Sequence, residues 1–237
     1  MSQYEVLNKE KHRQLRIKTG YGAALGDAVM SAMTFPLEFR DIQSCYPILF
    51  TKDPNTGGFF PAAIMGFEKD QNLFLQDDGW DAPYIPALAQ RQPFLIATGG
   101  EGDDRPPVVS LDLDHPRVSQ DEGESLFDNE GEPSEFLKQK IALLDKLHGG
   151  LQHSVGFVDT LLQHELLEQI TLDIAFNDGS KQTLQGFYSI AEEQLYQLKG
   201  DVLESLNQAG YLQPIFMAVA SLSRMRGLIE RRNRLRV

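Results

Sequence analysis

The sequence predicts an α+β protein: a sheet-rich N-terminal half packed with a helical C-terminal half that contains a β-hairpin. Three observations predict this class. Short apolar runs separated by turn residues fill the first half, two alternating runs flank Asn177-Asp178-Gly179, and apolar residues at helical spacing dominate residues 191–233. We expect one α+β domain over residues 1–237, and any seam between subdomains should fall within 100–133.

The strands expected in the first half share a short apolar run bounded by turn residues. They are residues 13–18, 47–51, 59–67, 72–75, 93–97 and 108–113. We expect the last two runs to extend the same sheet as the earlier ones. Pro36 favours the first turn of a short helix over 36–42, because its fixed φ suits that position and its missing N–H is not needed there.

An acidic segment and a pair of glycines divide the second half of the sequence into its expected elements. Residues 101–135 hold twelve acids against Arg105 and Arg117, which predicts a solvated loop. Ser134 then suits an N-cap, and we expect a helix over 136–147 that stops at Gly149-Gly150, followed by a second helix over 155–168.

The sequence around Asn177-Asp178-Gly179 predicts a hairpin. Residues 170–176 alternate between apolar and polar side chains, the three turn residues favour a tight reversal, and residues 182–190 return. Helices over 191–209 and 212–233 follow, divided at Gly210.

Composition excludes several classes of protein. With 41% hydrophobic residues the chain can build a core, and its formal net charge of -12 opposes general nucleic-acid binding, which needs surplus Lys and Arg. Cys45 is the only cysteine, so neither an intramolecular disulfide nor a thiolate zinc cluster can form. We interpret Cys45 as a small core residue of a protein in a reducing compartment.

No membrane span or export signal is expected. The longest uncharged stretch, 205–223, contains Asn207, Gln208, Gln213 and Pro214. The basic run at 9–18 starts too late for a signal peptide, and Asp27 interrupts the apolar part that follows. We therefore expect a cytoplasmic protein without a membrane span.

Two glycine clusters and one carboxylate cluster are candidates for ligand chemistry. Gly20, Gly22 and Gly26 nearly match a dinucleotide-binding pattern, but the third glycine comes one residue late, so turn glycines are expected. The cluster at 99–104 is surrounded by acids that would repel phosphate. Two carboxylates and an imidazole in one extended segment form a weak candidate metal site. They are Asp112, Asp114 and His115.

The densest group of aromatic and polar residues lies between 77 and 94. A tryptophan beside a turn serves either as a lid over the core or as an anchor for recognition. We select four residues as a candidate surface for a ligand or partner, in which the aromatic rings stack and the arginine pairs with an anion. They are Trp80, Asp81, Tyr84 and Arg91.

The last fourteen residues are strongly basic, with six arginines against Glu230. Cations at the C-terminal end of a helix interact favourably with its dipole, so a solvated basic end is one interpretation. The alternatives are docking onto the acidic 101–135 segment, on this or another copy, and contact with an anionic partner. A homo-oligomer through this Arg-rich helix is one form of the second interpretation.

Several stretches, taken in order, resemble the bacterial SapC family. They are residues 46–50, 72–75 through Trp80 to 84–86, 92–94, 126–131, 186–188 and 221–222. Family members are labelled peptide transporter permeases or linked to surface layers. They are also encountered beside TonB-dependent receptors, flavin halogenase-like enzymes and cupin-like oxygenases. The resemblance implies an accessory role in outer-membrane nutrient uptake or substrate modification, and it supplies no catalytic residues.

The sequence favours a binding or accessory protein without a cofactor, which acts on a protein or small-molecule partner that the sequence does not identify. No catalytic residues can be assigned, because neither a Gly-x-Ser-x-Gly elbow nor a triad context is present. The alternative is a metal-dependent enzyme, oxygenase-like or modifying, centred on Asp112, Asp114 and His115.

Overall fold

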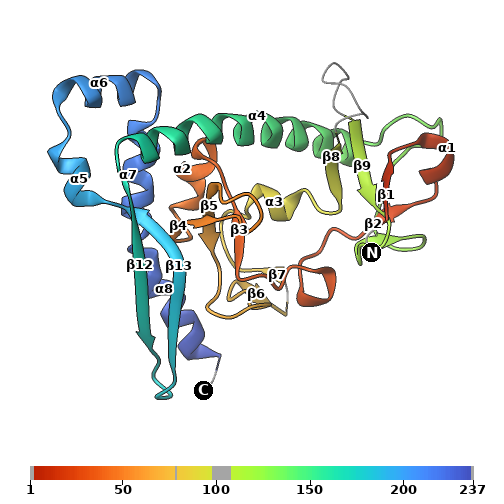
Figure 1. The fold of residues 1–237 in the computed structure, drawn as a ribbon. Helices are drawn as coiled ribbons and strands as arrows, with labels where there is room; N and C mark the ends of the chain where they lie inside the picture. The colour runs from red at the N-terminus through yellow and green to blue at the C-terminus, as the bar shows by residue number, and fades with distance from the viewer. Residues whose placement is uncertain (1–2, 78, 98–107, 236–237) are drawn as a thin grey trace. The chain divides into compact units, whose positions relative to one another are not determined.

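The computed structural model describes residues 3–77, 79–97 and 108–235, so the glycine cluster at 99–104 and part of the expected seam lie outside the described residues. Contacts between Cα atoms divide the chain into two compact units. The first unit comprises Met1–Ala28, Leu75–Trp80 and Ala87–Gly149, and the second comprises Val29–Phe74, Asp81–Pro86 and Gly150–Val237. The elements confirm the α+β class (Figure 1).

Small antiparallel sheets form the first unit. One has the order β1-β9-β8, one the order β10-β2-β11, and β6 pairs with β7. The strands are β1 (Tyr4–Val6), β2 (Arg16–Ile17), β6 (Leu75–Gln76), β7 (Gly79–Trp80), β8 (Phe94–Ala97), β9 (Val108–Asp112), β10 (Val118–Ser119) and β11 (Glu124–Ser125). The helical segments are α1 (Lys9–His12), η1 (Ala23–Leu25), α3 (Ala87–Gln90) and the first part of α4 (Glu135–Gln163).

A buried ion pair organises the glycine-rich loop of the first unit. Arg117 donates through Nη2 to Asp27 Oδ2 at 2.7 Å, and the same Oδ2 accepts the backbone N–H of Gly22 at 2.8 Å. Both charged side chains are almost fully buried. Gly26 adopts φ +86°, a conformation that glycine reaches without a steric penalty. The glycines at 20–26 therefore lie in a turn, as expected.

The second unit contains a five-stranded antiparallel sheet of order β12-β13-β4-β5-β3. Its strands are β3 (Ser31–Met33), β4 (Ile48–Lys52), β5 (Phe59–Ile64), β12 (Leu167–Ala175) and β13 (Lys181–Ile190). The predicted hairpin is confirmed as β12 and β13, with Ala175 opposite Lys181 and Gly179 at φ +82° in the turn. Its return strand joins the rest of the sheet where Tyr188 pairs with Phe50.

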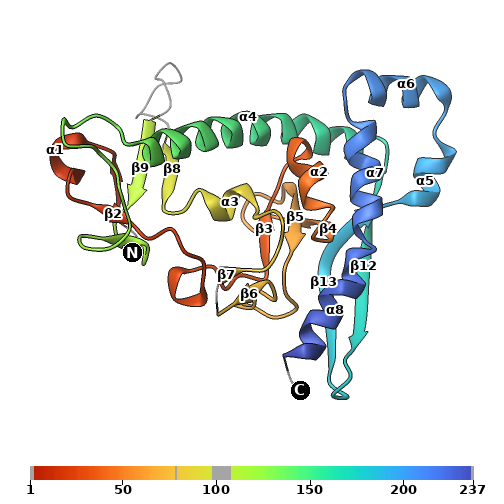
Figure 2. The same cartoon turned by 180° about the vertical axis from the view of Figure 1, so that it is seen from behind.

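The second unit also contains helical segments. They are η2 (Pro36–Glu38), α2 (Phe39–Ile42), the second part of α4, α5 (Glu192–Gln197), α6 (Gly200–Gln208), α7 (Leu212–Ser221) and α8 (Arg224–Arg234). Pro36 occupies the first helical turn as predicted. Figure 2 shows α7 and α8 following each other alongside β13 and β12. The fully buried Ser221 joins α7 to the sheet, because its hydroxyl accepts the N–H of Ile48 at 2.8 Å.

Several expectations about the elements were wrong. The helices expected over 191–209 and 212–233 are each divided in two, into α5 and α6 and into α7 and α8, and part of the loop expected over 101–135 forms β10 and β11. Gly149-Gly150 does not stop a helix, because α4 runs unbroken from Glu135 to Gln163 and the next element is a strand. Gly150 is needed there, since a Cβ at this position would lie 2.3 Å from the buried Phe35 ring. The runs at 93–97 and 108–113 do not extend the sheet of β4 and β5, because β8 and β9 pair with β1 in the first unit.

The uncharged stretch at 205–223 is divided between α6 and α7, with Gly210 at φ +75° between them. Across the described residues, none of the helices combines the length and apolar character that a bilayer crossing requires.

Candidate anion-binding pocket

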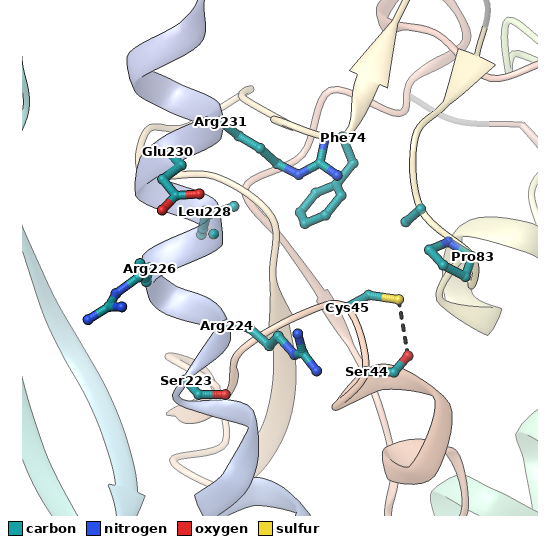
Figure 3. A pocket seen from close by; sticks show the side chains of 12 residues that line it. Ser44, Cys45, Phe74, Pro83, Ser223, Arg224, Arg226, Leu228, Glu230 and Arg231 are labelled. Atoms are coloured by element: carbon teal, nitrogen blue, oxygen red, sulfur yellow. Dashed lines mark hydrogen bonds between the residues drawn. The ribbon is translucent and has the colours of Figure 1, made fainter.

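Helix α8 is oriented by the residues that it buries. Leu228 is 1% exposed and Arg232 is 3% exposed, and these two positions lie on one face because they are four residues apart. Arg224, Gly227 and Arg231 then follow one another along a neighbouring face of the helix. They border a pocket of about 310 Å³, which we call the α8 pocket (Figure 3).

Arg231 is held in place by two partners. Its Nη1 donates to Asp81 Oδ2 at 2.7 Å and its Nη2 donates to the backbone oxygen of Asp81 at 3.0 Å. Its guanidinium also lies 4.3 Å from the centre of the Phe74 ring, and Phe74 is buried. This cation–π contact and the paired hydrogen bonds fix the arginine against the segment 81–86.

Arg224 has more free hydrogen-bonding capacity. Its Nε donates to the backbone oxygen of Gln43 at 3.2 Å, which is the single hydrogen bond that it makes to the described residues. Figure 3 shows its guanidinium extending toward Ser44, on the side of α8 that faces Cys45 and Pro83. Nη1 and Nη2 of Arg224 are therefore available for a carboxylate or phosphate.

The remaining pocket lining contains apolar groups, hydroxyls, a thiol and one carboxylate residue, Glu230. Phe74, Ala82, Pro83 and Leu228 supply the apolar part, and Ser44, Ser223 and the half-buried Cys45 supply polar atoms. Arg226 also borders the pocket, but in Figure 3 it points to the opposite side of α8 from Cys45 and Pro83. The arrangement suits an anionic group with a compact apolar body.

The thiol of Cys45 lies beside a serine hydroxyl in this pocket. Cys45 Sγ lies 3.2 Å from Ser44 Oγ, and that hydroxyl lies 2.6 Å from the backbone oxygen of Asp41. Among the described residues that line the pocket, none is a histidine that could act as a base for the thiol.

The four residues selected from the sequence are divided between the two units. Trp80 and Arg91 belong to the first unit, and Asp81 and Tyr84 to the second. The Trp80 ring meets Tyr21 edge-on, with 5.5 Å between ring centres. Arg91 donates to the backbone oxygen of Phe94 at 2.6 Å, and burial lowers the pKa of its guanidinium.

Tyr84 points its hydroxyl into the second unit. Its Oη donates to Glu38 Oε1 at 2.8 Å, and its backbone oxygen accepts the hydroxyl of Tyr46 at 2.6 Å. Burial raises the pKa of Tyr84, and the negative charge of Glu38 raises it further. Asp81 alone of the four borders the α8 pocket, through its pairing with Arg231.

The candidate metal ligands are occupied by local hydrogen bonds. Asp112 Oδ1 accepts the N–H of Asp114 at 3.2 Å, and Asp114 Oδ2 accepts the N–H of Gln3 at 3.0 Å. His115 Nδ1 accepts the N–H of Arg117 at 3.2 Å, and burial lowers the pKa of His115. Within residues 3–77, 79–97 and 108–235, no three His, Cys, Asp or Glu side chains are grouped so that they could hold a metal ion.

Sequence reasoning found the basic helix and Asp81 but missed how they meet. The sequence did not indicate Phe74, Ser44 or Arg224 as site residues, because the segments that line this pocket are far apart in the chain. Asp81 and Arg231, for example, are separated by 150 positions. One signal was present: Arg224, Gly227 and Arg231 recur at three and four positions, which places them on one helical face.

The fold is α+β, and arginines line the α8 pocket of its second unit. A family model described as SapC matches residues 7–228, and the chain therefore belongs to the SapC family. This confirms the resemblance found in the sequence. The chain matches no curated protein and no solved structure at a significant level.

Proposed function

We propose that this SapC-family chain is a non-catalytic accessory protein that binds an anionic group in the α8 pocket. One observation carries the proposal: Asp81 pairs with Arg231, so the aromatic 81–86 segment and the Arg-rich helix form a single surface. Of the four residues expected to form a contact surface, Asp81 supports this proposal through its pairing with Arg231.

The chemistry of Arg224 supports an anionic ligand. A guanidinium presents two parallel N–H donors that match a carboxylate or phosphate, and such charge-assisted hydrogen bonds are stronger than neutral ones. Ser44 and Ser223 add hydroxyl groups, while Pro83 and Leu228 favour an apolar body on the ligand. The rest of the chain is acidic, so it repels anions that are not held by specific contacts.

We place this role beside outer-membrane nutrient uptake or substrate modification, as the family context implies, and in the cytoplasm. The single cysteine supports a reducing compartment. Trp80 and Arg91 remain a proposed contact of the first unit for a protein partner. This part of the proposal is abandoned if Trp80→Ala leaves partner binding unchanged.

The pocket is tested with benzoate and inorganic phosphate, titrated separately into the purified chain and followed by isothermal titration calorimetry and thermal shift. We expect saturable binding of at least one anion, and at least tenfold weaker binding by Arg224→Gln. Arg234→Gln is the matched control, because Arg234 is exposed on the same helix and lies outside the pocket. The proposal fails if both variants bind alike, or if neither anion binds.

A further inference from the structure

A second groove lies along the preceding helix. It has a volume of about 460 Å³, and we call it the α7 groove. Phe216 is 46% exposed there and lies beside Leu212 and Met217 in the lining. The lining residues are Gln43, Asn207, Leu212, Gln213, Phe216, Met217 and Ala220.

The α7 groove and the α8 pocket are neighbours. Gln43 lines the groove and the next residue, Ser44, lines the pocket, while the backbone oxygen of Gln43 accepts the Nε of Arg224. At the junction of the helices, Ser223 Oγ donates to the backbone oxygen of Ala220 at 2.9 Å. The end of α2 therefore borders both depressions.

Eight of the lining positions form one stripe through α7 and α8, because Leu222 and Ser223 between these helices also have helical backbone angles. The lining residues Leu212, Arg226, Leu228 and Glu230 are not part of this stripe. The eight positions recur at intervals of three and four residues, as positions on a single face do. The stripe comprises Gln213, Phe216, Met217, Ala220, Ser223, Arg224, Gly227 and Arg231. Its first half is apolar with amide groups and its second half is cationic.

The amide side chains that line the α7 groove favour a peptide over a fatty acid as the elongated anionic ligand. A fatty acid would place its hydrocarbon tail against Gln43, Asn207 and Gln213, and would leave their donors and acceptors without partners. A peptide offers backbone N–H and C=O groups to these amides and an apolar side chain to Phe216 and Met217. An acidic side chain of the same peptide then complements Arg224.

We propose that the α7 groove and the α8 pocket together bind an extended peptide segment of a partner protein. The segment carries a large apolar side chain and an acidic side chain about four residues apart. This spacing follows because Phe216 and Arg224 are eight residues apart in α7, its helical junction and α8, which corresponds to roughly 12 Å at about 1.5 Å per residue, while an extended chain advances about 3.3 Å per residue. The acidic contact rests on the proposed anion site, whereas the apolar contact does not.

An array of synthetic peptides tests the spacing. Each peptide carries one Phe and one Glu in a Gly/Ser chain, separated by one to eight positions and in both orders, and is probed with the full chain. We expect binding to be strongest when the two anchors are about four residues apart. The strongest peptide is then labelled with fluorescein and measured by polarisation.

Two pairs of variants test the placement of the peptide. Phe216→Ala and Arg224→Gln should each weaken binding by about tenfold or more, since anchor residues dominate such interfaces. Val155→Ala and Arg234→Gln should change it less than twofold. Val155 is 63% exposed on a helix of the same unit and lines neither depression.

Three outcomes would overturn the peptide proposal. The first is equal binding of peptides that lack Phe. This outcome would be compatible with the anion pocket but would show that the α7 groove does not contribute to peptide binding. The second is tighter binding of dodecanoate with the same dependence on Phe216 and Arg224, which makes the ligand a lipid anion. The third is no binding by any peptide, while benzoate or phosphate still binds and supports the proposed function alone.

Discussion

Asp81 and Arg231 are joined by two hydrogen bonds, one to the side chain of the aspartate at 2.7 Å and one to its backbone oxygen at 3.0 Å. The second bond does not depend on the carboxylate. The Arg231 guanidinium also stays stacked on Phe74 without it. The Asp81 carboxylate therefore adds a negative charge to the edge of the α8 pocket. It is one of three groups that hold Arg231, together with the Asp81 backbone oxygen and the Phe74 ring.

Asp81→Asn should therefore strengthen anion binding while barely changing stability. The Asp81 side chain is 59% exposed, so the loss of the ion pair should cost less than about 1 kcal/mol of unfolding free energy. The neutral amide accepts a weaker hydrogen bond from Arg231 Nη1 than the carboxylate does, and it removes a negative charge that repels the ligand. Calorimetry with phosphate and urea denaturation measure the two effects, and weaker phosphate binding would contradict the prediction.

Gly149 and Gly150 should respond oppositely to alanine, although they are neighbours in α4. A Cβ at Gly149 meets nothing within 4 Å, so Gly149→Ala should gain about 0.5–1 kcal/mol from helix propensity. A Cβ at Gly150 would overlap the Phe35 ring, which is fully buried, and Gly150→Ala should lose about 1–3 kcal/mol. Urea denaturation followed by circular dichroism compares the two variants, and equal effects would refute the packing argument.

Asp27→Asn should strongly destabilise the first unit. Both side chains of the Asp27–Arg117 pair are at most 4% exposed, and removing one charge leaves the other buried without compensation. The expected loss is about 3 kcal/mol. Denaturation monitored by the fluorescence of Trp80, which lies in the same unit, measures it.

The control for this prediction is Glu122→Gln. Its partner Lys18 lies at 3.0 Å, but the two side chains are 73% and 37% exposed, so solvent screens the pair and stability should hardly change. A loss for Asp27→Asn no larger than that for Glu122→Gln would contradict the role given to the buried pair.

Tyr84→Phe should destabilise the second unit by about 1–3 kcal/mol, because Glu38 Oε1 loses a hydroxyl donor in a site where Glu38 is fully buried. Tyr196→Phe is the matched control, since Tyr196 is 73% exposed. Hydrogen exchange of the β4 amides isolates the response of this unit. Exchange rates unchanged in both variants would show that the hydroxyl contributes nothing to stability.

Because the Tyr84 hydroxyl ionises, we expect the free energy of unfolding to depend on pH. Burial, and then Glu38, raise the pKa of Tyr84 in the folded chain above its usual value, which is about 10 in an unfolded chain. The unfolded chain therefore loses this proton first as pH rises. The stability that Tyr84 contributes is present below about pH 10 and is lost above it.

Measurements of unfolding free energy between pH 8 and pH 11 check the sign. We expect a decline above about pH 10 that is shallower in Tyr84→Phe. Tyr21 contributes a similar decline in the first unit, because burial also raises the pKa of Tyr21. The exchange of second-unit amides separates the two, and an equal slope with and without Tyr84 would contradict the assignment.

Local features of the sequence predicted the elements that depend on local energetics. Asn177-Asp178-Gly179 favours a tight reversal whatever surrounds it, and Pro36 suits a first helical turn, so both elements were placed correctly. The two glycines in α4 were wrongly predicted to end a helix, because their effect depends on tertiary packing and not on local preference. Each costs a helix about 1 kcal/mol, which the packing of Gly150 against Phe35 overrides.

The candidate site was predicted only in part. The basic helix and Asp81 were selected, but the sequence does not distinguish Arg224, which faces the pocket, from Arg226, which points away. That distinction depends on which side of α8 is buried, and Leu228 and Arg232 decide it through contacts with distant parts of the chain. Tyr84 was assigned to an open surface for the same reason, since its partner Glu38 is 46 positions away.

By itself, then, the sequence determined the α+β class, the hairpin, the division at Gly210 and membership of the SapC family, because these follow from local conformational preference and from ordered sequence pattern. Only the tertiary structure decided that Asp81 meets Arg231, that Arg224 makes one hydrogen bond to the described residues, and that α7 and α8 share one lined face. Such relationships arise when burial of apolar side chains brings distant segments together, and no local pattern encodes them.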